Sequence, residues 1–169
     1  MIVSTIIAVL AIFILLNLGN FKKLLEVKTN CEPFEKTFAI IKPDAVQVKN
    51  TGSIIDIVEH HDFVILKLEK LVISTKQAEE FYAIHKDRPF FKDLINYITS
   101  GPSIIMVLQK EHAIKDWRAL MGATDPAKAS EGTIRKLFGT DITHNAVHGS
   151  DSIDNAKKEI QLFYPNFIY

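Results

Sequence analysis

Four short runs of aliphatic, β-branched and aromatic residues, separated by segments of helical periodicity, restrict this chain to few folds. The first run covers residues 36–41 and stops at Pro43, and the second alternates between apolar and charged residues over 63–73. The third covers 103–109, and the fourth surrounds residue 148. Runs of this length and composition predict β-strands, the first of them buried on both faces.

Apolar residues recur three or four positions apart between these runs, which predicts amphipathic helices. We expect helices over residues 54–61, 75–85, 90–98, 114–121, 133–138 and 153–163. Ser74–Thr75 and Ser152 are the expected caps of the second and last of them. The connections are too short for a large parallel sheet. The order therefore predicts an α+β domain with a ferredoxin-like βαββαβ core, in which helices cover a four-stranded antiparallel sheet.

One histidine stands among small residues in the stretch Asn-Ala-Val-His-Gly-Ser-Asp-Ser, residues 145–152. Residues 145–147 are expected to run extended up to His148. Gly149 would let the backbone approach a bulky partner, and the serines and aspartate after it supply turn and cap chemistry. The imidazole of His148 is therefore expected at the end of an element, facing a cavity.

The amino-acid composition excludes several classes of protein. The 169 residues suit one domain, and 20 basic residues balance 20 acidic ones. With no net charge, the chain has no global field to attract nucleic acid, so we expect no specific nucleic-acid partner. The single cysteine, Cys31, excludes an internal disulfide and fits a reducing, cytoplasmic compartment. Glycine-rich phosphate loops are absent, so side chains must bind any phosphate.

The N-terminal residues 1–20 are strongly apolar, which leaves two interpretations open. Residues 2–18 approach the length of a membrane span, and Lys22 and Lys23 after them would tether the rest of the chain to the cytoplasmic face of a membrane. Alternatively, the start codon is assigned too far upstream. Residues 21–35 are interpreted as a linker, and residues 36–169 as the folded domain.

Motifs in a shared order carry a resemblance to a known family. They are Lys42-Pro43-Asp44-Ala45, Phe81-Tyr82-Ala83 with His85, Arg88-Pro89-Phe90-Phe91, Ser100-Gly101-Pro102, Leu120 to Pro126, Gly132-Thr133-Ile134-Arg135, and the stretch around His148. In this set the chain resembles the nucleoside diphosphate kinases. The resemblance implies the same fold and a ping-pong transfer of the γ-phosphoryl group from a nucleoside triphosphate, mainly ATP, to nucleoside diphosphates. A phosphohistidine on the pros nitrogen of His148 would be the intermediate, and maintenance of NTP and dNTP pools the role.

The resemblance also implies which residues act. The catalytic set would be His148, Glu159, Ser150, Lys42 and Tyr82, with Glu159 holding the imidazole. The nucleotide set would be Lys42, His85, Phe90, Leu94, Arg118, Thr124, Arg135, Ile142 and Asn145. Within it, His85, Arg118, Thr124 and Arg135 would contact phosphates, Lys42 and Asn145 the sugar, and Phe90, Leu94 and Ile142 the base.

Mg²⁺ is the implied cofactor, carried on the nucleotide phosphates without protein ligands, and a homo-oligomer, tetramer or hexamer, is the implied assembly. His144 and His148 are four residues apart, but that spacing converges on one metal ion only in a helix, which Gly149 disfavours. Two other classes of protein fit the sequence less well. A non-catalytic, membrane-tethered nucleotide-binding protein would tolerate loss of His148, Lys42 or Arg118, and all three are present. A protein-histidine phosphotransfer module would not need Phe90 and Asn145 for a nucleoside.

Overall fold

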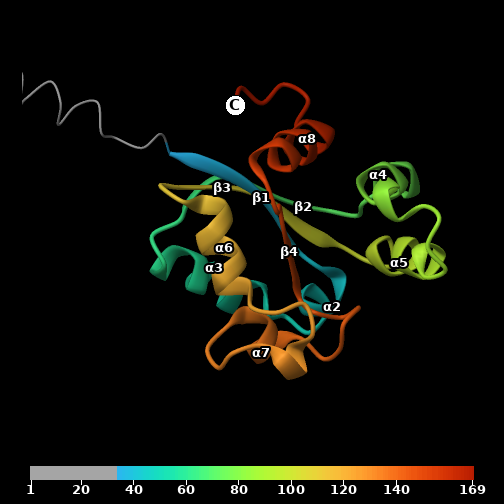
Figure 1. The fold of residues 1–169 in the computed structure, drawn as a ribbon, viewed down its shortest axis with the longest axis horizontal. Coiled ribbons are helices and arrows are strands. Elements are labelled where there is room, and N and C mark those ends of the chain that lie inside the picture. The colour runs from blue at the N-terminus through green and yellow to red at the C-terminus, as the bar shows by residue number, and fades with distance from the viewer. Residues whose placement is uncertain (1–33) are drawn as a thin grey trace, which may run out of the picture. The chain divides into compact units, whose positions relative to one another are not determined.

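A single antiparallel sheet forms the centre of the computed structural model, which describes residues 34–169. Its strands are β1 (Glu35–Ile41), β2 (Val64–Leu71), β3 (Ser103–Lys110) and β4 (Val147–Gly149), in the order β2-β3-β1-β4 with every neighbouring pair antiparallel (Figure 1). This is the strand order of a βαββαβ core, and the predicted fold class is confirmed.

The predicted apolar segment 1–20 and all but the last two residues of the predicted linker 21–35 lie outside the described residues. Strand β1 begins at Glu35, next to the predicted domain boundary. Within residues 34–169, no helix combines the length and the hydropathy that crossing a bilayer requires.

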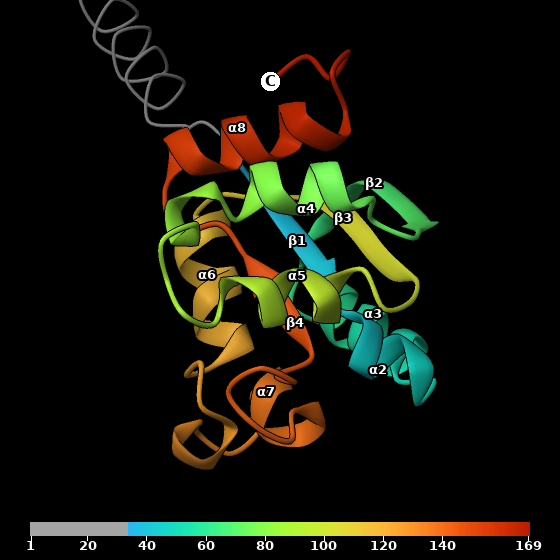
Figure 2. The ribbon, with the colours of Figure 1, turned by 90° about the vertical axis from the view of Figure 1, so that its right-hand side faces the viewer.

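The helices and 3-10 turns are arranged on the two faces of the sheet. Their bounds are α2 (Pro43–Gln47), α3 (Thr51–His60), α4 (Thr75–Phe81), η1 (Ala83–His85), α5 (Phe91–Ile98), α6 (Ala113–Met121), η2 (Pro126–Lys128), α7 (Ile134–Phe138) and α8 (Ile153–Phe163). Helices α3 and α6 cover one face, and α4, α5 and α8 cover the other (Figures 1 and 2).

The helix predictions are confirmed in place, but not in every boundary. The predicted helix 75–85 ends at Phe81 and tightens into η1, and the sequence patterns missed the short elements α2 and η2. Ser74 forms a full capping box with Gln77, and the hydroxyl of Ser152 accepts the N–H of Asn155 at the start of α8, so both predicted caps are confirmed.

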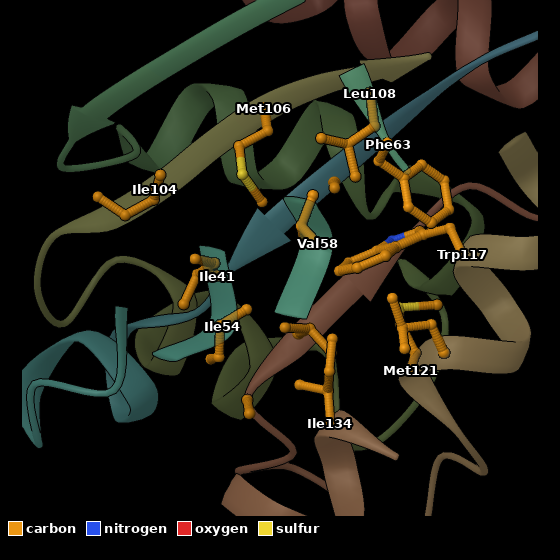
Figure 3. Packing of buried hydrophobic residues seen from close by; sticks show 14 of the residues in the cluster. Ile41, Ile54, Val58, Phe63, Ile104, Met106, Leu108, Trp117, Met121 and Ile134 are labelled. Carbon is orange, nitrogen blue, oxygen red and sulfur yellow. The ribbon is translucent and has the colours of Figure 1, made fainter. Parts of the chain in front are cut away.

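Strand β1 supplies side chains to two hydrophobic cores because successive residues of a strand point to opposite faces. Ala39 and Ile41 belong to the core between the sheet and helices α3 and α6, where Trp117 packs edge-on against Phe63 (Figure 3). Phe38 and its neighbour Ile40 belong to the core under α4, α5 and α8. Burial of both faces explains why the run 36–41 lacks apolar–polar alternation.

Strand β2 is one of the two edge strands, β4 being the other, and is largely exposed, as its alternating sequence predicts. A register shift between Ile65 and Lys67 places a bulge in its pairing with β3. Bulges are common at sheet edges, where they increase the local twist.

Candidate active site

A cleft of about 280 Å³ gathers most of the predicted site residues. It is lined by Lys42, Tyr82, Leu94, Arg118, Thr124, Arg135, Ile142, Asn145, His148, Gly149, Asp151 and Glu159. Of the predicted set, only Ser150, His85 and Phe90 are outside this lining. Gly149 and Asp151 line the cleft although the sequence analysis gave neither a role in ligand binding.

His148 lies on the short strand β4, opposite Ile40 of β1, and its imidazole is tied to helix α8. Its Nε2 is 3.2 Å from Oε1 of Glu159, and the hydroxyl of Ser150 donates to Oε2 of the same carboxylate at 2.5 Å. An ionised carboxylate only accepts, so the proton is on Nε2 and the lone pair of Nδ1 is free. The three side chains therefore present Nδ1, the pros nitrogen, as a nucleophile.

The backbone of His148 is held by a tryptophan. Nε1 of Trp117 donates to the carbonyl of His148 at 3.1 Å. A Cβ on the adjacent Gly149 would come within 2.2 Å of Cδ1 of Trp117, so only glycine allows this approach. The expectation that Gly149 admits a bulky partner is confirmed, and Trp117 is that partner.

Lys42 follows β1 directly and is buried beside Asn145. Its ammonium donates to Oδ1 of Asn145 at 2.7 Å, and the amide nitrogen of Asn145 donates to the carbonyls of Thr124 and Ile142 at 3.0 and 2.9 Å. Burial, and secondarily the positive charge of Arg135, lower the pKa of Lys42 to about 8. The amine is thus a cation with little solvent around it at neutral pH.

Two arginines bring further positive charge to the cleft. Arg135 of α7 is buried, and its Nη1 and Nη2 donate to the carbonyls of Gly122 and Val147 at 3.0 and 3.1 Å. Its Nε is buried without a partner among residues 34–169. Burial and the charge of Arg118 on α6 lower its pKa to about 10. A cleft with three cations is suited to a polyanionic ligand.

The extended conformation expected for residues 145–147 is wrong. Ala146 has φ 64°, and the N–H of Val147 donates to the carbonyl of Asn145 at 2.7 Å, so the chain makes a tight three-residue turn here. The N–H of Ala146 donates to Oδ2 of Asp44 at 3.0 Å, while its carbonyl accepts the N–H of Lys42 at 2.8 Å. These distant partners, invisible to a local pattern, fix the turn.

Phe90 and His85 are outside the cleft lining, but aromatic contacts connect them to Tyr82, which lines it: the ring centres of Tyr82 and His85 are 6.4 Å apart. Phe90 is 51% exposed, and the centre of its ring is 5.7 Å from that of His85. Ile142 is 62% exposed, although it lines the cleft. Large apolar side chains in the open at a cleft are typical of ligand contacts.

Tyr82 is the buried aromatic of the lining, and burial and the charge of Glu159 raise the pKa of its hydroxyl. Within residues 34–169, this hydroxyl makes no hydrogen bond to His148. His144, the other histidine considered as a metal ligand, contacts Asp141: its Nδ1 is 2.9 Å from Oδ2 of that carboxylate. In the same part of the chain, no group of three or more His, Cys, Asp or Glu side chains could hold a metal ion.

Comparisons with known proteins show which family the chain resembles. The sequence profile described as "Nucleoside diphosphate kinase" matches residues 35–168. A nucleoside diphosphate kinase of a Geobacter species is 54% identical over 130 residues, covering 77% of this chain and 95% of the relative. One from Campylobacter jejuni subsp. doylei is 52% identical over 136 residues, covering 80% and 99%.

Solved structures are similar as well. The enzyme of Aquifex aeolicus superimposes with a TM-score of 0.75 at 39% identity, covering 78% of this chain and 95% of that one. The enzyme of Halobacterium salinarum, solved in complex with CDP, superimposes with a TM-score of 0.75 at 41% identity, covering 78% and 88%.

Proposed function

Because the chain belongs to the nucleoside diphosphate kinase family, whose members are phosphotransferases, we propose that it moves a γ-phosphoryl group between nucleotides through a phosphohistidine on His148. The donor is a nucleoside triphosphate, mainly ATP, and the acceptors are nucleoside diphosphates. Maintenance of NTP and dNTP pools is the role that follows. The observation that carries the proposal is the hydrogen-bonded set of His148, Glu159 and Ser150 at the wall of a cationic cleft.

The reaction is written as two displacements at phosphorus. In the first, the Nδ1 lone pair of His148 forms a bond to the γ-phosphorus as the bond from that phosphorus to the β–γ bridging oxygen breaks, and the nucleoside diphosphate leaves with the electron pair. The imidazole gains positive charge, which Glu159 stabilises through the Nε2 proton. A second diphosphate then attacks phosphorus with a terminal oxygen, the bond from phosphorus to Nδ1 breaks, and its electron pair returns to Nδ1 to restore neutral His148.

Charge on the moving phosphoryl group is spread over its equatorial oxygens, so the chain acts mainly by positioning and electrostatics. Arg118, Arg135 and Thr124 of the lining are assigned to the phosphates, and so is His85, which is outside the lining. The unpartnered Nε of buried Arg135 supports an anionic ligand there, since a buried donor without a partner is costly. Lys42 is assigned both to the transferred group and to the sugar. Burial strengthens its field because the local dielectric is low.

The nucleoside is assigned to the outer part of the cleft. Asn145, with Lys42, would bind the sugar hydroxyls, and exposed Phe90 would stack on the base, with Leu94 and Ile142 as further apolar contacts. Every base has a face that stacks, so we expect broad base specificity. The CDP bound by the halobacterial relative is compatible with this expectation.

Mg²⁺ fits the cleft as a companion of the nucleotide. The only acidic residues of the lining are Asp151 and Glu159, and Glu159 is engaged by His148 and Ser150. Such a lining cannot cage a divalent ion but suits one that arrives on phosphate oxygens. When bound, Mg²⁺ neutralises phosphate charge.

A labelling experiment tests the intermediate. Incubation with γ-labelled ATP and Mg²⁺, without acceptor, should leave a label on the protein that is lost in acid, and His148→Ala should remove it. Label that is stable in acid and lost in base would instead identify a serine such as Ser150. Acid-labile label that persists in His148→Ala would overturn the proposal.

The assembly is proposed as a homo-oligomer, a tetramer or hexamer, by analogy with the family. Light scattering of residues 34–169 measures the mass directly, and a monomer at micromolar concentration would contradict the proposal.

A further inference from the structure

Tyr97, near the end of helix α5, is hydrogen-bonded to a carboxylate next to the cleft. Its hydroxyl donates to Oδ1 of Asp44 at 2.7 Å, across 53 residues of sequence. Burial and the hydrogen bond to Asp44 raise the pKa of this hydroxyl, so it stays a donor at working pH. Tyr97 itself is not part of the cleft lining.

The other carboxylate oxygen of Asp44 accepts a hydrogen bond from the strained turn at Ala146. Oδ2 accepts the N–H of Ala146 at 3.0 Å, and Ala146 has φ 64°, a conformation that residues with a Cβ rarely adopt. Such a conformation persists only where surrounding contacts hold it. The N–H of Lys42, which donates to the carbonyl of Ala146 at 2.8 Å, is the second of these contacts.

The residue before the turn is Asn145, whose side chain accepts the ammonium of Lys42 at 2.7 Å. The backbone of Ala146 therefore determines where this amide and this ammonium stand. Tyr97 also has its ring 5.9 Å from the same ammonium. A chain of contacts thus runs from Tyr97 through Asp44 and Ala146 to the Lys42–Asn145 pair.

We propose that Tyr97 is a positioning residue for the sugar-binding side of the cleft: by orienting Asp44 it holds the Ala146 turn, and so aligns Asn145 and Lys42 with the nucleoside hydroxyls. The inference rests on the proposed function, in which this pair receives the sugar. The hydroxyl acts through the turn and touches no substrate atom.

The test is Tyr97→Phe, which keeps the ring and deletes the donor. Its kcat/KM is measured with a ribonucleoside triphosphate and with the 2′,3′-dideoxy analogue, which lacks the hydroxyls that the pair would bind. The ratio of the two values should fall on the order of 10-fold, a size typical of losing a hydrogen bond to a charged group. Asn145→Ala should also lower the ratio of kcat/KM for the ribonucleotide to kcat/KM for the dideoxy analogue.

If Tyr97 acts through Asn145, adding Tyr97→Phe to the Asn145→Ala variant should lower this ratio no further.

Tyr164→Phe is the matched control, because the hydroxyl of Tyr164 is buried without a hydrogen-bond partner among residues 34–169. It should leave the ratio unchanged. Asp44→Asn, which cannot accept both bonds in the same way, should behave like Tyr97→Phe and gives a second route to the same readout.

The outcomes separate the inference from its premise. A lowered ratio in Asn145→Ala with an unchanged ratio in Tyr97→Phe would overturn the role of Tyr97 alone. An unchanged ratio in both would overturn the sugar assignment and the inference with it, while the histidine label would still report on the phosphotransfer. Equal losses for both substrates in Tyr97→Phe, with a lowered melting temperature, would mean a structural role and would also overturn the inference.

Discussion

Glu159 of α8 holds Nε2 of His148 of β4 at 3.2 Å, while its second oxygen accepts the hydroxyl of Ser150. Both oxygens of the carboxylate are therefore in use, and the imidazole has one orientation and one tautomer. The nucleophilic character assigned to Nδ1 depends on this arrangement more than on any other contact of the cleft.

Glu159→Gln should keep the phosphohistidine but slow its formation by roughly 10–100-fold, because the amide still orients the ring while the charge that stabilises the imidazolium is gone. Rapid-quench labelling measures the rate. Glu131→Gln is the control, since that carboxylate is 88% exposed and pairs with Lys136 at the surface. An unchanged labelling rate in Glu159→Gln would mean that the charge of Glu159 does not contribute to the phosphorylation of His148.

The activity should decline as pH rises through about 8, where Lys42 loses its proton. Below that pH the amine is a cation that attracts the phosphates, and above it the amine is neutral, so kcat/KM, which reports on the free enzyme, falls. Lys42→Arg should abolish this decline near pH 8 even if its activity is lower, because the guanidinium stays charged. A profile that is flat from pH 7 to 9.5 in the unmodified protein would refute the assignment.

Phe90→Ala should weaken the binding of all nucleoside triphosphates to a similar extent, by about 1–3 kcal/mol, because any base can stack on an aromatic ring. Steady-state kinetics with purine and pyrimidine triphosphates measure the loss. Phe34→Ala removes an aromatic ring that is also exposed but precedes β1, far along the chain from the cleft, and should change none of them. A loss confined to one base would contradict stacking.

Gly149→Ala should destabilise the fold by roughly 1–3 kcal/mol, because its Cβ would overlap the rigid indole of Trp117. Gly52→Ala in helix α3 is the matched control. Nothing lies within 4 Å of the added methyl there, and alanine in a helix is favoured by about 1 kcal/mol. Chemical denaturation should therefore give shifts of opposite sign. A Gly149→Ala variant as stable as the parent would show that Trp117 can shift at little cost to make room for the methyl group.

Residues 34–169 alone should fold and be active, because they form a compact unit of their own and contain every assigned site residue. Expression without the first 33 residues, followed by the labelling assay, measures this. Recovery of only insoluble or inactive protein would mean that the N-terminal residues contribute to the fold.

The order and type of the main elements could be predicted from the sequence. Their signals are local, since the period of apolar residues reports which faces are buried, as in the uninterrupted apolar run of β1 and the stripe of α6. The resemblance supplied the assigned residues, and most of them do meet in one cleft. Short elements such as α2 were missed because five residues are too few to establish a helical period.

How these residues are held depends on contacts between distant parts of the chain. Ala146 adopts its left-handed turn because Asp44, 102 residues earlier, accepts its N–H, and Tyr97 orients that carboxylate from another helix. Gly149 is required by a tryptophan from α6. No local pattern encodes such contacts, because they exist only once packing of the two cores has brought β1, β4 and the helices together.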